Sequence, residues 1–313
     1  MAGAVVVVGS LNMDFVVTVE HLPAPGETVL GRDFQMIPGG KGANQACAAG
    51  KLAAGGVPVR MIGRVGCDIF ADQLKASLSA AGVDVSGVLT ARKHPTGVAL
   101  IWVDRAGQNS IVVAPGANST LSAADVAAKR EVFRGGSHAL FQLETPLRTV
   151  ATALALARAE GLVTVLDPAP AQPLPRGWLE QVDLVTPNES EALLLLGRPP
   201  ARVTVEDAPA LARELLQLGP RAVVLKLGDQ GCFYSAGAES CYQAAFPVEV
   251  RDTTAAGDTF NAALAIALAE ARPVPAALRF AAAAAAISVT RLGAQSSAPN
   301  RAETEALMAA LMM

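Results

Sequence analysis

The chain has 313 residues, of which 51% are hydrophobic and only 4% aromatic, so Ala, Val and Leu must fill most of its core. A net charge of −3 argues against a nucleic-acid partner or a polyanionic membrane surface, because no strongly basic face can form. Four cysteines without a CxxC spacing and three scattered histidines predict a reduced, cytoplasmic protein with no structural metal.

Short apolar runs that suit buried parallel strands recur along the chain. The first, at 4–9, lacks the basic residues that precede a signal-peptide core and is therefore predicted as a strand. The other predicted strands are 59–65, 138–143, 162–167, 183–187 and 222–227. Helical patterns separate most of them, and the chain is mostly helical after Ala256. This alternation predicts βαβ units, a parallel sheet and an α/β fold. The longest apolar run, 280–289, is too short to span a bilayer, so no membrane contact is expected.

Two segments, 14–37 and 96–118, break the alternation. Each reads as antiparallel strands joined by a turn with Pro-Gly or Ala-Gly. The stretch VALIWV (98–103) is apolar on both alternating faces, which a hairpin lying on a surface should not be. We expect a small β lid over the carboxyl edge of the main sheet, which also contacts a second subunit; ordinary core burial is the alternative.

The stretch GGKGANQA (39–46) is the first candidate binding motif. A Walker phosphate loop needs GxxxxGK[ST], and here Gly42 follows Lys41, so that motif is excluded. The glycines leave backbone amides open to a ligand, and Asn44 opens the next helix with both a donor and an acceptor. These features favour a neutral polyhydroxylated ligand. A glycine turn with Asn44 as the helix N-cap is the simpler interpretation.

Two polar residues follow the first predicted strand in GSLNMD (9–14). Asn12 and Asp14 stand two residues apart on an extended chain and point to the same side. At the carboxyl end of a parallel strand, an amide and a carboxylate can chelate adjacent sugar hydroxyls. A plain turn residue is the alternative for Asp14.

Two further stretches fit a nucleotide site. In TPNESEALLLLG (186–197), Asn188 and Glu191 have the capping-box spacing, and Glu191 can also approach a magnesium-bound phosphate through water. In LKLGDQGC (225–232), a strand ends in a turn whose amides can face phosphates or ribose, although a hairpin turn is the simpler interpretation.

The stretch RDTTAAGDTFNAAL (251–264) places a carboxylate where an apolar helix begins. If Ala255, Ala256 and Gly257 turn tightly before the helix, their amides converge and can neutralise a phosphoryl group in flight. Asp258 then stands where it can accept the proton of an attacking hydroxyl. A capping or first-turn Asp is the alternative.

Together these stretches resemble the ribokinase family of sugar kinases, the PfkB carbohydrate kinases. GGKGANQA and DTTAAGDTFNAAL match the two hallmark patterns of the family. The similarity continues through GSLNMD, PAPGETV, TGVALIWV, VAPGAN, FQLETP, DPAPA, TPNESEA and RLGAQSSAP, from about residue 5 to 299. It implies one kinase domain over 1–313: a three-layer α/β/α sandwich with a mainly parallel sheet. A β lid from segments near 12–37 and 94–115 would clasp that of a second subunit in a homodimer. The reaction implied is transfer of the γ-phosphate of ATP to O5 of ribose.

The resemblance also implies roles for individual residues. Asp258 would be the base, in an anion hole formed by Ala255, Ala256 and Gly257. Ribose would be held by Asn12, Asp14, Gly40, Lys41, Gly42, Ala43, Asn44, Glu144 and Asp258. The nucleotide would contact Asn188, Lys226, Leu227, Gly228, Asp229, Gln230, Gly231, Gly257, Asp258 and Ala282, with magnesium held near Glu191 through water. Activating potassium would lie near Asp252, Thr254, Ser288, Arg291, Gly293 and Ser297.

Two positions depart from the family pattern. Lys226 replaces a small hydroxyl residue, so its side chain either reaches a phosphate or points away. Ala282 stands where related enzymes often carry Asn or His beside adenine, so that contact should be missing.

Other functions remain open alternatives. The acceptor could be deoxyribose, fructose, a sugar phosphate or a nucleoside, although the sugar motifs hold only one lysine and no aromatic cluster. A sugar-binding protein without catalysis is a further alternative, against which Gly257 and Asp258 argue. A dinucleotide-binding oxidoreductase is set aside, because GxGxxG is missing.

Overall fold

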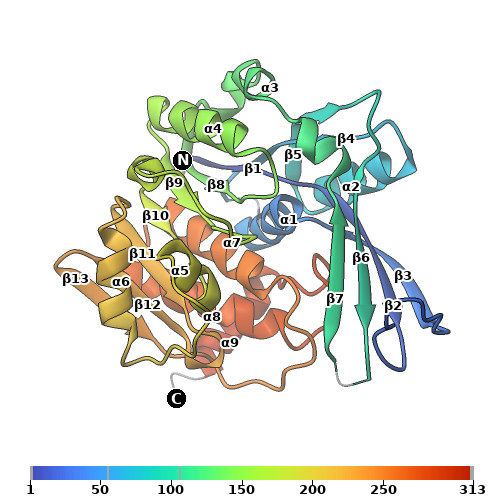
Figure 1. Cartoon of the computed structure of the whole chain (residues 1–313). Coiled ribbons are helices and arrows are strands. Elements are labelled where there is room, and N and C mark those ends of the chain that lie inside the picture. The colour runs from blue at the N-terminus through green and yellow to red at the C-terminus, as the bar shows by residue number, and fades with distance from the viewer. Residues whose placement is uncertain (1–2, 55, 106, 311–313) are drawn as a thin grey trace.

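The computed structural model describes residues 3–54, 56–105 and 107–310, and a nine-stranded sheet forms its centre (Figure 1). The strand order is β13 (Glu239–Gln243), β12 (Cys232–Ala236), β11 (Ala222–Lys226), β10 (Leu184–Val185), β9 (Val163–Leu166), β8 (Gly136–Phe141), β1 (Ala4–Val8), β4 (Val59–Val65) and β5 (Val83–Thr90). From β11 to β5 neighbouring strands pair in parallel, and β12 and β13 add an antiparallel edge. All the runs predicted as strands contain strands. β5 and β13 were not foreseen, and β12 was implied only by the hairpin interpretation of 225–232.

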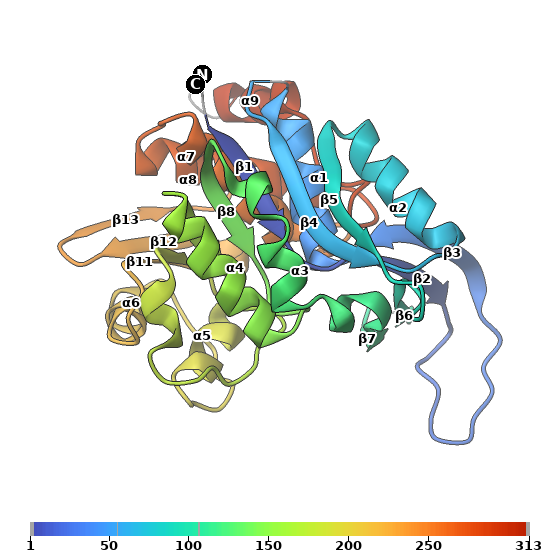
Figure 2. The ribbon, with the colours of Figure 1, turned by 90° about the horizontal axis from the view of Figure 1, so that it is seen from above.

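Helices cover both faces of this sheet, as the view from above shows (Figure 2). One face carries α1 (Lys41–Ala53), α2 (Ile69–Ala80), α7 (Ala256–Ala269), α8 (Val274–Ser288) and α9 (Arg301–Ala310). The other carries α3 (Ala123–Ala127), α4 (Leu147–Ala159), α5 (Glu189–Leu195) and α6 (Ala208–Leu216). Alternate residues of β1 feed the two cores, with Val5 and Val7 in one and Val6 and Val8 in the other. The predicted three-layer α/β/α fold is confirmed.

The Ala-rich run after Arg279 forms α8 and packs inside the protein. Its small side chains are buried against α7, so the two helices approach closely. Among the described helices, none combines the length and apolar character needed to cross a membrane.

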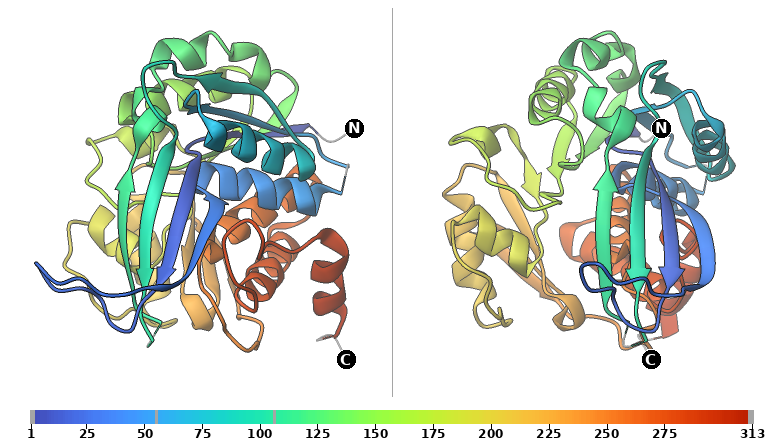
Figure 3. Two further views of the ribbon diagram at one scale, coloured as in Figure 1. Left: turned by 90° about the vertical axis from the view of Figure 1, so that its right-hand side faces the viewer. Right: turned by 45° about the vertical axis from the view of Figure 1, so that its right-hand side comes forward.

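A separate four-stranded sheet forms the lid beside the main body (Figure 3). Its order is β3 (Arg32–Gly39), β2 (Asn12–Thr18), β6 (Gly97–Val103) and β7 (Asn109–Ala114). The predicted antiparallel pairs are present as β2 with β3 and β6 with β7, and a parallel pairing of β2 with β6 joins them. Ala106, in the predicted Ala-Gly turn, lies outside the described residues.

The strand order predicts where along the edge of the main sheet a ligand can bind. From β1 the chain first builds β4 and β5 on one side and later returns to build β8 to β11 on the other. In open α/β sheets, ligands bind beyond the carboxyl ends of the strands where the order reverses. That point lies between β1 and β8, and β2 of the lid starts just after β1.

Candidate active site

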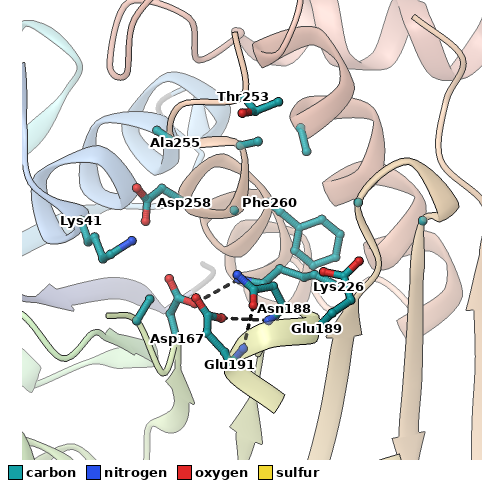
Figure 4. A pocket seen from close by; sticks show the side chains of 16 residues that line it. Lys41, Asp167, Asn188, Glu189, Glu191, Lys226, Thr253, Ala255, Asp258 and Phe260 are labelled. Atoms are coloured by element: carbon teal, nitrogen blue, oxygen red, sulfur yellow. Dashed lines mark hydrogen bonds and ion pairs between the residues drawn. The ribbon is translucent and has the colours of Figure 1, made fainter. Parts of the chain in front are cut away.

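Polar residues follow the carboxyl ends of neighbouring strands and meet at this switch point. Glu144 follows β8, Asp167 follows β9, Asn188 follows β10 and Lys226 ends β11. Asp167, Asn188 and Lys226 line a cavity of about 540 Å³ together with Asp258 at the start of α7 (Figure 4). The sheet therefore brings residues from distant parts of the sequence to one cavity.

Asp258 lies in the first turn of α7 and is 5% exposed. Its carboxylate accepts hydrogen bonds from Asn44 Nδ2 at 3.1 Å and Gln45 Nε2 at 3.0 Å, both on α1. Burial, helped by the charge of Asp167 and opposed by Lys41, raises the pKa of Asp258 to about 6. No side chain caps α7 within the described structure, so the first-turn position is right and the capping role is wrong.

The residues before Asp258 differ in part from the predicted tight turn. Only Ala255 is left-handed, with φ 57°, whereas Ala256 and Gly257 already belong to the helix. The amide of Ala256 donates to the carbonyl of Thr253 at 3.2 Å. Among the residues described, the amides of Ala255, Gly257 and Asp258 therefore remain without an acceptor at the start of α7, with the positive end of the helix dipole behind them.

We call Asn12, Asp14, Asn44 and Glu144 the acceptor side of the site. Asn118 Nδ2 donates to Asn12 Oδ1 at 2.8 Å, which leaves the Asn12 amino group for a ligand. The oxygen Asn44 Oδ1 is buried without a hydrogen-bond partner in the described structure. A ligand hydroxyl would satisfy both groups, because it can accept one hydrogen bond and donate another.

The carboxylates of the acceptor side lie close enough to influence each other. Burial first, and then the charges of Glu144 and Asp258, raise the pKa of Asp14 to about 7. Glu144 Oε2 accepts from Ser10 Oγ at 2.5 Å and from the amide of Lys41 at 3.0 Å. These contacts hold Glu144 in place.

The glycine motif lets α1 approach the turn after β1. Helix α1 begins at Lys41 with Gly40 as its N-cap, so Asn44 as the N-cap is wrong. A Cβ on Gly42 would lie 2.6 Å from the carbonyl carbon of Gly9, so this glycine provides close packing. Ala43 is fully buried and also packs in the core.

Lys41 supplies the positive charge in the glycine motif 39–46. Burial lowers its pKa, but nearby carboxylates outweigh this and raise the pKa of Lys41 above its usual range. The carboxylates responsible, in order, are Asp258, Asp167, Glu144 and Glu191. Lys41 therefore offers a fixed positive charge beside Asp258.

A second cavity, of about 470 Å³, adjoins the first and is largely apolar. Phe246, Val248, Ala282 and Val289 line it, and Phe260 lines both cavities. A flat aromatic base would fit such a slot. We call this slot, with Asn188 and the turn 226–231, the nucleotide side.

The turn 226–231 is the hairpin between β11 and β12, as the simpler interpretation predicted. Gly228, Asp229 and Gly231 line the cavities. Leu227 is fully buried, and the Gln230 side chain turns away to bond the backbone of residues 203 and 205.

Asn188 and Glu191 form the predicted capping box of α5. Asn188 Oδ1 accepts from the Glu191 amide at 2.9 Å, and Glu191 Oε2 accepts from the Asn188 amide at 2.8 Å. Burial, partly offset by Lys226, raises the pKa of Glu191. Across the described ranges no three or more His, Cys, Asp or Glu side chains could hold a metal together. Magnesium bound near Glu191 would need phosphate and water ligands, which this ion accepts.

Asp252 links the two segments, 252–254 and 288–297, that the family resemblance assigns to a monovalent cation. Its Oδ1 accepts from the amide of Thr254 at 2.9 Å, and its Oδ2 from the amide of Gly293 at 2.8 Å. The loop before α7 is thereby tied to the loop after α8.

The other side chains of these segments bond locally. The hydroxyls of Ser288 and Ser297 donate to carbonyls three residues earlier, each at 2.8 Å, and Arg291 pairs with Glu303 at 2.7 Å. Backbone carbonyls are therefore the oxygens that these residues could offer to a cation.

Comparison with known proteins agrees with this geometry. Residues 2–301 match the family described as pfkB family carbohydrate kinase. The chain belongs to this family. It is 41% identical to the ribokinase of Haemophilus influenzae over 97% of this chain and 98% of that one. It is also 34% identical to the deoxyribokinase of Salmonella typhi, over 95% of each chain.

Solved structures of the family share the fold. The Arabidopsis thaliana ribokinase complexed with ribose and ATP has a TM-score of 0.90 and 35% identity, covering 98% of this chain and 99% of that one. An E. coli protein in complex with ATP and Mg²⁺ has a TM-score of 0.81 and 25% identity, with the same coverage. The chain is thus a ribokinase-like kinase.

Three buried residues near Asp258 were not predicted as site residues from the sequence: Gln45, Gln142 and Asp167. Gln45 Nε2 donates to Asp258 and also to Asp167 Oδ2 at 3.1 Å, and Gln142 Nε2 donates to Gln45 Oε1 at 2.6 Å. Asp167 is the last residue of the predicted strand 162–167 and lies just after β9 in the structure, so the strand-end signal that singled out Asn12 and Asp14 could have found it. Gln45 stands within the glycine motif, but its target could not be read from the sequence.

Proposed function

We propose that the chain phosphorylates D-ribose at O5 with ATP. The observation that carries the proposal is the position of Asp258, buried where the polar acceptor side meets the apolar nucleotide side. A base at that junction can reach a sugar hydroxyl while the γ-phosphate approaches from the other direction. The relatives named ribokinase, and the Arabidopsis structure with ribose and ATP, support this choice.

The reaction is a direct in-line transfer. Asp258 accepts the proton of the ribose O5 hydroxyl as O5 bonds to the γ-phosphorus. The bond from that phosphorus to the β–γ bridging oxygen breaks, and ADP leaves. The amides of Gly257 and Asp258, beside Ala255 and Ala256, lie where charge develops on the phosphoryl oxygens. With a pKa of about 6, Asp258 is largely ionised at neutral pH.

Ribose is proposed as the acceptor because the acceptor side offers several hydrogen-bonding groups. Asn12, Asp14, Asn44 and Glu144 match a small polyol with adjacent hydroxyls. Gly40 and Lys41, with the buried Gly42 and Ala43 behind them, complete the binding segment.

Deoxyribose is the second candidate acceptor, since a relative of similar length is a deoxyribokinase.

A coupled ADP-release assay tests the acceptor. We expect ribose to give the highest kcat/KM in a panel with deoxyribose, fructose and adenosine. A higher kcat/KM for another acceptor would replace ribose. Ribose binding without ADP release from any sugar would favour a non-catalytic binding protein.

ATP, Mg²⁺ and K⁺ are the proposed cofactors. Asn188, the turn 226–231 and Ala282 would hold the nucleotide. Magnesium would be bound through water by Glu191, and when bound it neutralises phosphate charge. Potassium would be held by Asp252, Thr254, Ser288, Arg291, Gly293 and Ser297.

The chain is further proposed to act as one domain over 1–313, in the cytoplasm, as a homodimer joined through the lid. Phe34, Met36, Ile111 and Val112 on the lid are each more than 50% exposed in the single chain. Met36, Leu100 and Val112 lie in register across the lid sheet and therefore share one face, whereas Ile111 lies on the other face. An exposed apolar face of this kind marks an interface. Sedimentation should give a dimer, and charged substitutions at Val112, on the same face as Met36, should dissociate it.

A further inference from the structure

Lys226 carries a side-chain cation from the end of β11 to the mouth of α7. Its Nζ donates to Asp167 Oδ1 at 3.0 Å. A Cβ added to Gly257 would lie 3.3 Å from the same nitrogen. The ammonium group is therefore at the helix mouth, beside the amides that remain open there (Figure 4).

The ammonium group has hydrogen-bonding capacity to spare. It carries three donors, and over the described ranges Asp167 is its one hydrogen-bond acceptor. The side chain is 13% exposed and lines the cavity of about 540 Å³. Its remaining donors can reach a ligand in that cavity, and a nearly buried charge gains from such a partner.

Asp167, which accepts the hydrogen bond of Lys226, is held by the same glutamine that bonds the proposed base Asp258. Asp167 Oδ2 accepts from Gln45 Nε2, which also donates to Asp258 Oδ1. Gln142 orients the Gln45 amide by donating to its oxygen. One buried network thus fixes the ammonium group and the carboxylate relative to each other.

We propose that Lys226 is a further catalytic residue, whose ammonium group contacts the transferred phosphoryl group while Asp167 positions it. The proposal rests on the proposed kinase reaction. In the transition state the negative charge is redistributed over the phosphoryl oxygens. A preorganised cation at the helix mouth stabilises this charge distribution. Lys226 acts by its charge alone, and the proton of O5 still goes to Asp258.

A purely structural ion pair is the competing explanation. In that case Lys226 only neutralises the buried Asp167, and its removal would lower stability without a specific effect on phosphoryl transfer. The substitution Lys226→Gln separates the two explanations, because Gln can still donate to Asp167 but carries no charge.

The test compares Lys226→Met and Lys226→Gln with wild type. Lys93→Met is the matched control, since it removes an exposed lysine in the segment before β6. The readouts are kcat, the KM for ribose, the dissociation constant of AMP and the melting temperature. We expect kcat to fall roughly 100-fold in both Lys226 variants, as on loss of one oxyanion-hole donor. The KM for ribose and AMP binding should stay within about twofold of wild type, because neither involves the γ-phosphate.

A kcat within threefold of wild type in Lys226→Gln would overturn the proposal. So would a parallel loss of AMP binding, which would place Lys226 elsewhere on the nucleotide. If Lys226→Met does not fold, Lys226→Gln carries the same expectation. A wild-type chain that releases no ADP with any sugar would instead refute the proposed function itself.

Discussion

The acceptor side and the nucleotide side of this site are built by different means. On the acceptor side, the ligand would meet charged and amide side chains, such as the buried Asp14 and Asn44 and the half-buried Glu144. On the nucleotide side it would meet backbone amides of turns and helix α7, together with an apolar slot around Phe246 and Ala282. Asp258 stands between the two.

The difference has an energetic consequence. Crowded, buried carboxylates are costly to ionise, and the pKa of about 7 at Asp14 reports this cost. The nucleotide side holds the cation Lys226, which is paired with Asp167, and its apolar slot and helix-mouth amides carry no net charge. The acceptor side should therefore be the region where binding function opposes fold stability.

Removing the base tests the junction of the two sides and should have the largest effect. We expect Asp258→Asn to lower kcat by roughly 10²–10⁴, the usual worth of a positioned general base. Binding of ribose and ATP should change little, because the new amide oxygen can still accept from Gln45, and Asn44 can turn its unpartnered Oδ1 toward the new amino group. Asp72→Asn, an exposed change on α2, is the control in the ADP-release assay. A variant with near-normal kcat would remove Asp258 from the mechanism.

Asp14→Asn should separate function from stability on the acceptor side. We expect the KM for ribose to rise roughly 10- to 100-fold, since hydrogen bonds to charged groups are worth about 1.5–3 kcal/mol. The KM for ATP should not change.

The same variant should be more stable than wild type in the absence of sugar. The pKa of Asp14 rises from 3.8 to about 7 on folding, so wild type loses stability as pH increases between these values. At pH 8 the gain for Asp14→Asn should be roughly 2–4 kcal/mol, and it should vanish below pH 4. Urea unfolding at both pH values checks this, and equal stabilities at pH 8 would contradict it.

The pH dependence of the wild type should also reflect burial at the junction. Asp258 must be ionised to accept a proton, and burial raises its pKa to about 6. We therefore expect kcat at saturating ribose, where the titration of Asp14 no longer affects binding, to fall roughly tenfold per pH unit below pH 6 and to be constant just above it. A fall that begins only near pH 4 would mean that Asp258 keeps its ordinary pKa.

Ala282→Leu tests the nucleotide side alone. The larger side chain would enter the apolar slot, and we expect the KM for ATP to rise roughly tenfold, equivalent to about 1.4 kcal/mol. The KM for ribose should stay as in wild type, because Ala282 lines only the second of the two cavities described. A change confined to ribose would reverse the assignment of the two sides.

The two sides also differ in how far the sequence predicts them. Asn12 and Asp14 are predicted to face a ligand because a strand end and a spacing of two residues determine their direction. On the nucleotide side, the groups available depend on backbone hydrogen bonds. The Ala256 amide donates to the Thr253 carbonyl, and the Gln230 side chain bonds the backbone of Val203 instead of facing the cavity. Neither contact follows from the residue types.

The fold was more predictable than the contacts between segments. Apolar runs gave the parallel strands except β5, whereas β13 carries mostly polar residues and was missed. The contact between Gln45 and Asp167 joins residues 122 positions apart, and Lys226 reaches Asp167 across 59. Such contacts depend on the strand order, which periodicity alone does not determine.

The smallest expected effect concerns the loop that precedes α7 and contains Asp252. Asp252 ties this loop to Gly293, and a bound potassium ion would fix the same two segments more firmly. We expect potassium to raise kcat roughly fivefold over a buffer with a bulky organic cation, at the low end of usual coupling between sites. In Asp252→Asn this activation should weaken, because one carboxylate charge beside the cation is lost. Equal rates of wild type with and without potassium would show that the loop is already ordered by Asp252 alone.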